Sequence, residues 1–134
     1  MKVDGACYCG YLAFEAEVDP AQVCVCHCAD CQTLSGSAFR VVVPATPGSF
    51  RIVSGEPAIY VKLAESGNRR NLAFCPTCGT AIYSGPADGN SQYLGLRVGA
   101  LRQRSELAPR SQFWRRSALS WVDHIGDLTS HDSE

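Results

Sequence analysis

A chain of 134 residues that is 46% hydrophobic and 19% charged has the size and composition of one globular domain. Its twelve basic and thirteen acidic side chains give a formal charge of −1, which argues against nucleic acid as the main partner. The N-terminus shows no apolar signal segment, and the longest purely apolar runs, such as 41–43, are too short to cross a membrane. We therefore expect a cytoplasmic protein without membrane partners, whose eight cysteines stay reduced.

Alternation of apolar and polar residues dominates the sequence. In 11–18, Leu12, Phe14, Ala16 and Val18 fall on one face of a strand. Glycine- and proline-containing turns separate this strand from others predicted at 22–28, 37–44, 49–54, 58–63, 70–75, 80–84, 92–99 and 111–116. At most one helical turn is expected, after Cys28. The pattern predicts a mostly β fold of antiparallel sheets with cysteine knuckles at the strand ends.

We expect a single zinc-binding domain over 1–134, with its core at about 5–122. Residues 127–134 are polar and are expected to fray. Trp114 and Trp121 are expected to anchor the core.

Two short cysteine pairs are each followed by glycine. In CPTCG, Cys75 and Cys78 have the spacing that grips one zinc ion from a tight turn, and the glycine relieves the backbone after it. In CYCG, Cys7 and Cys9 supply a second pair of thiolates. The sequence therefore predicts a closed four-cysteine structural zinc site that ties the N-terminus to the middle of the chain. The alternatives are reduced core thiols or a redox-active pair, but the latter motif normally opens a helix.

The segment CVCHCADC, 24–31, holds the other four cysteines. Disulfides between such near neighbours are strained, so metal binding is the better interpretation. Cys24 and Cys28 lie about 13 Å apart along an extended strand, whereas a zinc–sulfur bond is only about 2.3 Å. Cys26, Cys28 and Cys31 form the compact trio, and His27 points away from it. If Cys24 also binds, the second zinc site is closed and structural; if it does not, the site is open and suited to catalysis.

At this point the sequence resembles a known family. The segments GACYCGYL, CHCADCQTLSGSAF, SGEP and FCPTCGTAI, in this order, are similar to those of the glutathione-dependent formaldehyde-activating enzymes, a family that includes centromere protein V. The resemblance implies a fold of twisted sheets and two zinc ions per chain, the second site possibly occupied only in part. It assigns the structural zinc to Cys7, Cys9, Cys75 and Cys78, and the second zinc to Cys26, Cys28 and Cys31. This chain departs from the family at Gln32, where Arg or Lys is common, and at Gln112, where His is frequent.

The resemblance implies an enzyme of carbon–sulfur chemistry, a lyase that adds glutathione or a similar thiol to formaldehyde or another small aldehyde through Cys26, Cys28 and Cys31. The alternative is a non-catalytic, zinc-stabilised binding module. Arginines crowd the region 97–116, and two interpretations stay open for them: a solvated face, or a rim that binds the carboxylates of glutathione.

Overall fold

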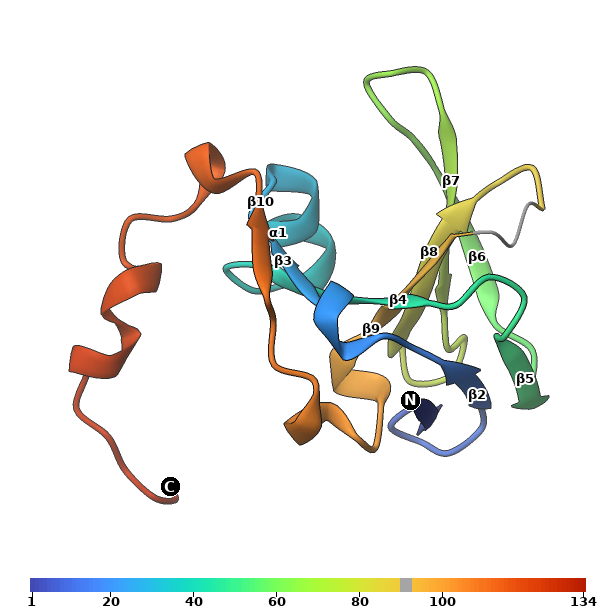
Figure 1. The fold of residues 1–134 in the computed structure, drawn as a ribbon, viewed down its shortest axis with the longest axis horizontal. Coiled ribbons are helices and arrows are strands. Elements are labelled where there is room, and N and C mark those ends of the chain that lie inside the picture. Colours follow the sequence, from blue (N-terminus) through green and yellow to red (C-terminus); the bar gives the residue numbers. More distant parts are fainter. Residues whose placement is uncertain (90–92) are drawn as a thin grey trace.

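The computed structural model describes residues 1–89 and 93–134, and β-strands dominate these residues (Figure 1). They form a small sheet of order β1-β2-β5 and a large sheet of order β10-β3-β4-β9-β8-β7-β6. Neighbouring strands are antiparallel, except that β10 and β3 are parallel. The predicted mostly β, antiparallel fold is confirmed. The strands are β1 (Lys2–Ala6), β2 (Ala13–Glu17), β3 (Cys24–Cys26), β4 (Arg40–Ala45), β5 (Arg51–Ser54), β6 (Ala58–Leu63), β7 (Arg69–Phe74), β8 (Ala81–Pro86), β9 (Leu94–Arg97) and β10 (Ser111–Phe113).

Each predicted strand has a counterpart among these elements, with ends displaced by a few residues, and residue 92 of the predicted strand 92–99 lies outside the described residues. Strand β1 was not predicted, because KVDGA has little apolar alternation. It forms by pairing along its whole length with β2, from Lys2 opposite Glu17 to Ala6 opposite Ala13. Tertiary pairing thus overrides a weak local signal.

The α-helix α1 (Ala29–Ser35) is longer than the single turn expected after Cys28. The Cys28 sulfur caps the helix by accepting a hydrogen bond from the Cys31 amide at 3.3 Å, and Asp30 stands in the first turn, where a negative charge is favourable. Gly36, with φ 63°, ends the helix in the left-handed conformation. A helix this short leaves no sustained periodicity in the sequence. Short 3₁₀ segments complete the fold: η1 (Pro20–Gln22), η2 (Val98–Ala100), η3 (Arg104–Glu106), η4 (Arg115–Ser117) and η5 (Val122–Asp127).

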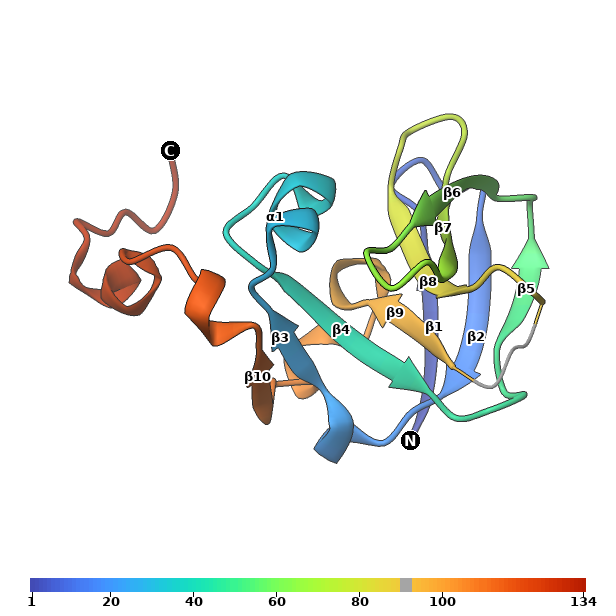
Figure 2. The ribbon, with the colours of Figure 1, turned by 90° about the horizontal axis from the view of Figure 1, so that it is seen from above.

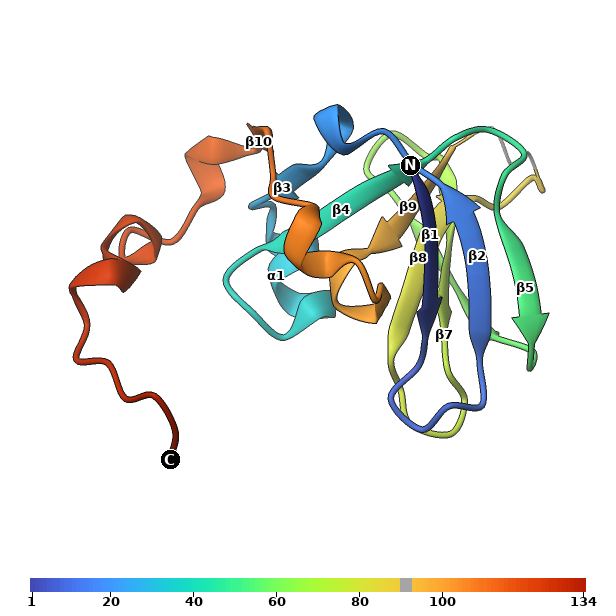
Figure 3. The ribbon, with the colours of Figure 1, turned by 60° about the horizontal axis from the view of Figure 1, so that its bottom comes forward.

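The core lies between the two sheets, which face one another in Figure 3. The four apolar residues of the first predicted strand are each at most 5% exposed, as the alternation predicts. Phe50 connects the sheets, because its ring lies 5.6 Å from that of Phe14 and 5.0 Å from that of Tyr83. Burial of these aromatic and aliphatic groups is the main force that holds the sheets together.

Beyond β10 the chain leaves the body of the molecule as an arm of 3₁₀ turns (Figures 1 and 2). Trp114 is 51% exposed and Trp121 is 54% exposed, so the expectation that both anchor the core is wrong. Trp114 directly follows β10, the edge strand of the large sheet, and Trp121 lies further along the arm, after η4. No helix within the described residues is long and apolar enough to span a membrane.

Candidate metal centre and adjoining cavity

The structure brings the four cysteines of the first predicted set together. Cys7 and Cys9 follow β1, Cys75 follows β7, and Cys78 precedes β8. Their sulfur atoms lie within 4.8 Å of one another, with 3.6 Å between Cys7 and Cys9 and 3.8 Å between Cys9 and Cys75. Four sulfurs at about 2.3 Å from a central zinc stand about 3.8 Å apart in a tetrahedron. The spacing fits a tetrahedral metal site and is far too long for disulfides.

Backbone amides are aimed at these sulfurs. The Cys7 sulfur accepts from the Leu12 amide at 3.2 Å, and the Cys75 sulfur accepts from the Thr77 and Cys78 amides at 3.4 and 3.5 Å. Such bonds stabilise thiolates. The glycine after each pair adopts positive φ, 83° at Gly10 and 79° at Gly79, as the motif predicts.

The pKa values of this set diverge, as expected of crowded ionisable groups. A hydrogen bond with the Thr80 hydroxyl lowers the pKa of Cys78 to about 5. The Tyr11 amide lowers the pKa of Cys9, but burial and the three neighbouring thiols outweigh it and raise that pKa to about 11. Four thiolates can coexist here only with a cation among them, so the donor set is chemically compatible with zinc.

A second group is formed by Cys26, Cys28 and Cys31, whose sulfurs also lie within 4.8 Å of one another. Strand β3 ends at Cys26, so the chain bends before Cys28, and α1 then returns Cys31 toward both. Burial raises the pKa of Cys31 to about 12, assisted by the neighbouring thiols and opposed by Arg40. Burial also acts to raise the pKa of Cys28, but hydrogen bonds from the Cys31 amide and the adjacent thiols more than offset it and lower that pKa. Three thiols therefore share one small site that could hold a metal ion, and two of them, Cys28 and Cys31, differ in acidity.

Cys24 stands outside this group in the described residues. It is only 8% exposed and is held within the large sheet, paired with Val42 of β4 and with Ser111 of β10. Burial raises the pKa of the Cys24 thiol. Cys24 therefore behaves as a buried strand residue, and the three-cysteine arrangement is the one that the structure presents.

His27 points away from the thiols and into the protein, where it is 1% exposed. Its ring lies edge-on to Phe39, 5.7 Å between centroids, and Nε2 donates to Oε1 of Gln112 at 2.8 Å. Gln32 donates to the His27 carbonyl at 2.8 Å and to the Ser117 carbonyl at 3.0 Å. Gln32 and Gln112, the two positions at which the chain departs from the family pattern, thus both form hydrogen bonds with His27. His27 lies between Cys26 and Cys28 of the second group.

A cavity of about 390 Å³ opens beside the second cysteine group. Cys26 and Cys31 line one part of it, with Phe113 and Trp114 from the start of the C-terminal arm. Four basic side chains from four different strands also line it: Arg40 of β4, Lys62 of β6, Arg70 of β7 and Arg97 of β9. The cavity therefore combines soft sulfur ligands with a strongly cationic wall.

Only one of these four cations is paired with a carboxylate among the described residues: Lys62 forms an ion pair with Asp30 of α1. The guanidinium of Arg70 lies over the ring of Tyr93, 5.9 Å from its centroid. Arg97 is 9% exposed, and it donates a hydrogen bond to the Gly95 carbonyl at 3.3 Å. Burial, with the nearby Arg40, lowers the pKa of Arg97 to about 9. Buried charge without a counter-ion is costly, so this wall is suited to an anionic ligand.

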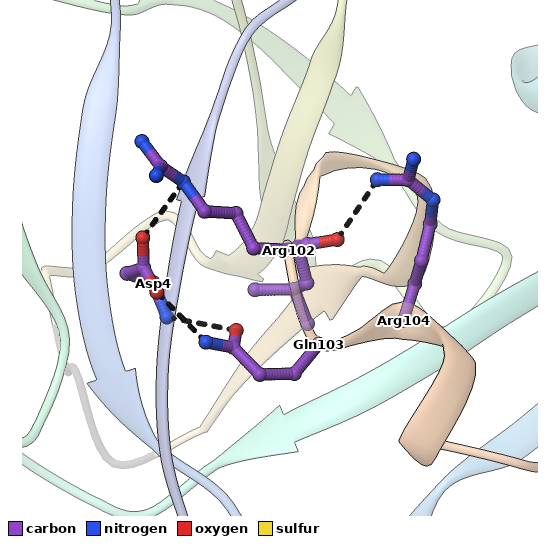
Figure 4. Close-up of polar contacts among 5 residues, drawn as sticks. Asp4, Arg102, Gln103 and Arg104 are labelled. Atoms are coloured by element: carbon purple, nitrogen blue, oxygen red, sulfur yellow. Dashed lines mark hydrogen bonds and ion pairs between the residues drawn. The ribbon is translucent and has the colours of Figure 1, made fainter.

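The other arginines of 97–116 do not contribute to this wall. Arg102 forms an ion pair with Asp4 at 2.9 Å, and Gln103 makes two hydrogen bonds with Asp4, one to its carboxylate at 2.7 Å and one from its amide at 3.1 Å (Figure 4). Arg104 donates to the Leu101 carbonyl. Arg115 is paired with Asp123 in the arm. The sequence left open whether the arginines of 97–116 form a carboxylate-binding rim. Among them, the structure places only Arg97 at the cavity.

Sequence reasoning missed Arg40, Lys62 and Arg70 as site residues. Each is a basic residue of a predicted strand, and the sequence alone does not distinguish such a residue from an ordinary surface charge. The long-range pairing β4-β9-β8-β7-β6 brings them to one cavity.

Comparisons with known proteins bear on the fold and on the family of the chain. The chain has the fold of a Rhodobacter sphaeroides protein known from a crystal structure, with a TM-score of 0.62 at 21% sequence identity over 81% of this chain and 98% of that one. No curated protein matches the sequence. The family profile described as "Glutathione-dependent formaldehyde-activating enzyme" matches residues 2–117. With both cysteine groups inside the matched region, the chain belongs to the glutathione-dependent formaldehyde-activating enzyme family.

Proposed function

We propose that this protein is a zinc-dependent enzyme of carbon–sulfur chemistry that joins glutathione, or a similar thiol, to a small aldehyde, in the manner of an S-(hydroxymethyl)glutathione synthase. The observation that carries the proposal is the cavity in which Cys26 and Cys31, two of the three grouped cysteines, face arginines without carboxylate partners among the described residues. Glutathione brings one thiol and two carboxylates, which match these two kinds of surface.

We assign Cys7, Cys9, Cys75 and Cys78 to a structural zinc and Cys26, Cys28 and Cys31 to a second zinc with a ligand position free for the substrate. The second zinc, when bound, supplies the positive charge that keeps a substrate thiol ionised at neutral pH. Free cysteines in two metal-type groups also suit the reducing cytoplasm, where we place the protein.

The residues of the cavity then have distinct tasks. Arg40 and Arg70 bind carboxylates, since a guanidinium can donate two parallel hydrogen bonds to one carboxylate. Arg97 balances negative charge at the sulfurs from a buried position. Phe113 and Trp114 cover the cavity on the side of the arm and limit the entry of water. Together these groups hold the thiolate in place and strengthen its electrostatic interactions.

Calorimetry with the zinc-loaded protein tests the proposal. Glutathione should bind, and titrations in buffers of different ionisation enthalpy should show release of about one proton as the thiol ionises. S-methylglutathione keeps both carboxylates but has no ionisable thiol, so it should bind more weakly and release no proton. If both ligands bind equally without proton release, the sulfur group does not bind the thiol. Tight glutathione binding without any acceleration of adduct formation would favour the non-catalytic binding module.

A further inference from the structure

A second, larger cavity of about 670 Å³ adjoins the cavity that Cys26 and Cys31 line, which we call the thiol cavity. Its wall is mainly apolar, with aromatic rings from four segments: Phe39 before β4, Tyr60 of β6, Phe74 of β7 and Tyr83 of β8. Val98 and Gly99 of η2 close one side. Cavities of roughly 300–1,000 Å³ with such walls are typical of sites for small organic ligands. We call this space the apolar cavity.

The apolar cavity shares part of its lining with the thiol cavity. Leu34, Arg40, Leu72 and Arg97 line both spaces and form the boundary between them. Leu34 lies three residues after Cys31 on α1, which places the two side chains on neighbouring turns of the same helix face. A ligand whose sulfur is at Cys26 and Cys31 therefore needs to extend only about one helical turn, roughly 5.4 Å, to reach the apolar cavity.

Formaldehyde has no substituent that could use this space. We propose that the carbonyl substrate of this enzyme is an aldehyde with an alkyl or aryl substituent, and that the apolar cavity binds this substituent. The inference rests on the proposed function and deepens it, because it names the class of aldehyde.

The reaction balances without a further reagent. The thiolate sulfur forms a bond to the aldehyde carbon, and the carbonyl π electrons move to the oxygen. The oxygen then takes a proton equivalent to the one that the thiol released. The product is an S-(1-hydroxyalkyl) thioether whose substituent lies beyond the boundary residues. Arg97 lines both spaces and is the buried cation available to the developing oxyanion.

Two stable thioethers test this inference without turnover. S-benzylglutathione and S-methylglutathione both lack a thiol, and they differ in a phenyl group placed where the aldehyde substituent would lie. Burial of a phenyl group strengthens binding by about ten- to hundredfold, so the benzyl ligand should bind more tightly to the zinc-loaded protein by that factor.

Two variants fill the apolar cavity from different elements. Ala81 of β8 is exposed and lines the cavity, so Ala81→Phe adds a ring there. A Cβ at Gly99 meets nothing within 4 Å, so Gly99→Leu adds bulk without a backbone clash. Both variants should abolish the preference for the benzyl ligand while leaving S-methylglutathione affinity within about twofold. Gly126→Leu is the matched control, because Gly126 is equally unobstructed but lies in η5 of the arm. It should keep the full preference.

The possible results separate the two proposals. If glutathione binds with proton release but the benzyl and methyl ligands bind equally, the inference is wrong and the proposed function stands. If glutathione does not bind, the proposed function fails and the inference fails with it. If the filling variants change the molar mass in light scattering and the benzyl preference is absent, the cavity is an interface between copies of the chain, which also overturns the inference. Circular dichroism and zinc content verify that each variant is folded.

Discussion

Nε2 of His27 donates a hydrogen bond to Oε1 of Gln112 across 2.8 Å, which joins the segment that carries the second cysteine group to β10. Gln32 of α1 adds a second link to the C-terminal part of the chain, because its side-chain amide donates to both the His27 and the Ser117 carbonyls. The His27 ring is fully buried, and its Nδ1 has no partner among the described residues. The ring therefore depends on Gln112 for its only side-chain hydrogen bond in the part of the chain that the structure describes.

Gln112→Ala should consequently loosen this end of the large sheet. The change leaves a buried imidazole N–H without an acceptor, which costs about 1–3 kcal/mol. Urea unfolding of the zinc-loaded protein should show this loss of stability. Gln22→Ala is the control, since Gln22 is exposed and, among the described residues, its side chain bonds only to the surface residue Asp19. Equal effects of the two substitutions would show that the contact with His27 does not stabilise the fold.

The first cysteine group is predicted to be essential for folding. It joins the chain after β1 to the β7–β8 turn, so its metal closes a long loop and adds binding energy to the native state. Cys78→Ser should abolish the cooperative thermal transition or make the protein insoluble, and zinc content per chain should fall. An unchanged melting temperature with full zinc content would refute this assignment.

The second cysteine group should be separable from folding. Cys31→Ser removes one of three ligands near the end of a cavity, and zinc content should fall toward one per chain while circular dichroism stays that of a folded protein. Cys24→Ser should retain both zinc ions, because its sulfur lies outside the group. Loss of the second zinc in Cys24→Ser would instead make this site a closed, four-cysteine one.

The arginine wall should govern affinity for the thiol. Arg70→Ala removes a guanidinium that has no carboxylate partner among the described residues, and glutathione should bind about 10- to 100-fold more weakly, as for loss of a charge-assisted hydrogen bond. Arg110→Ala is the control, because Arg110 is exposed and lines neither cavity. Calorimetry measures both. A wild-type affinity for Arg70→Ala would place the carboxylates of the ligand elsewhere.

How much of the fold and of the site the sequence could predict depends on how many residues each sequence pattern spans. Cysteine spacing acts over two or three residues, and both cysteine groups meet as the spacing indicates. Alternation predicted the strand Ala13–Glu17 because that strand buries one face. The cationic wall depends on strand order, which no local pattern encodes. Arg40 and Lys62 meet at one cavity only because β4 and β6 bend around it within a seven-stranded sheet, with three strands between them.

The buried charge of Arg97 should lower the stability of the ligand-free protein and strengthen the binding of glutathione. Its pKa is lowered to about 9 because burial disfavours the charged form, so at neutral pH, below this value, the folded protein carries the full penalty of a buried cation. The penalty should fall as pH rises above about 9, since the folded state then loses its proton while the unfolded chain still keeps it.

Arg97→Met removes the charge at similar volume, and at pH 7 it should stabilise the ligand-free protein by about 1–3 kcal/mol in urea unfolding. The same variant should bind glutathione at least tenfold more weakly, since the cation that faces the sulfurs is gone. Arg102→Met is the matched control: Arg102 is exposed and paired with Asp4 on the opposite side of η2, so its loss should give neither the stabilisation nor the weaker binding. A destabilised Arg97→Met protein would show that the Arg97 side chain contributes to packing more than its buried charge costs.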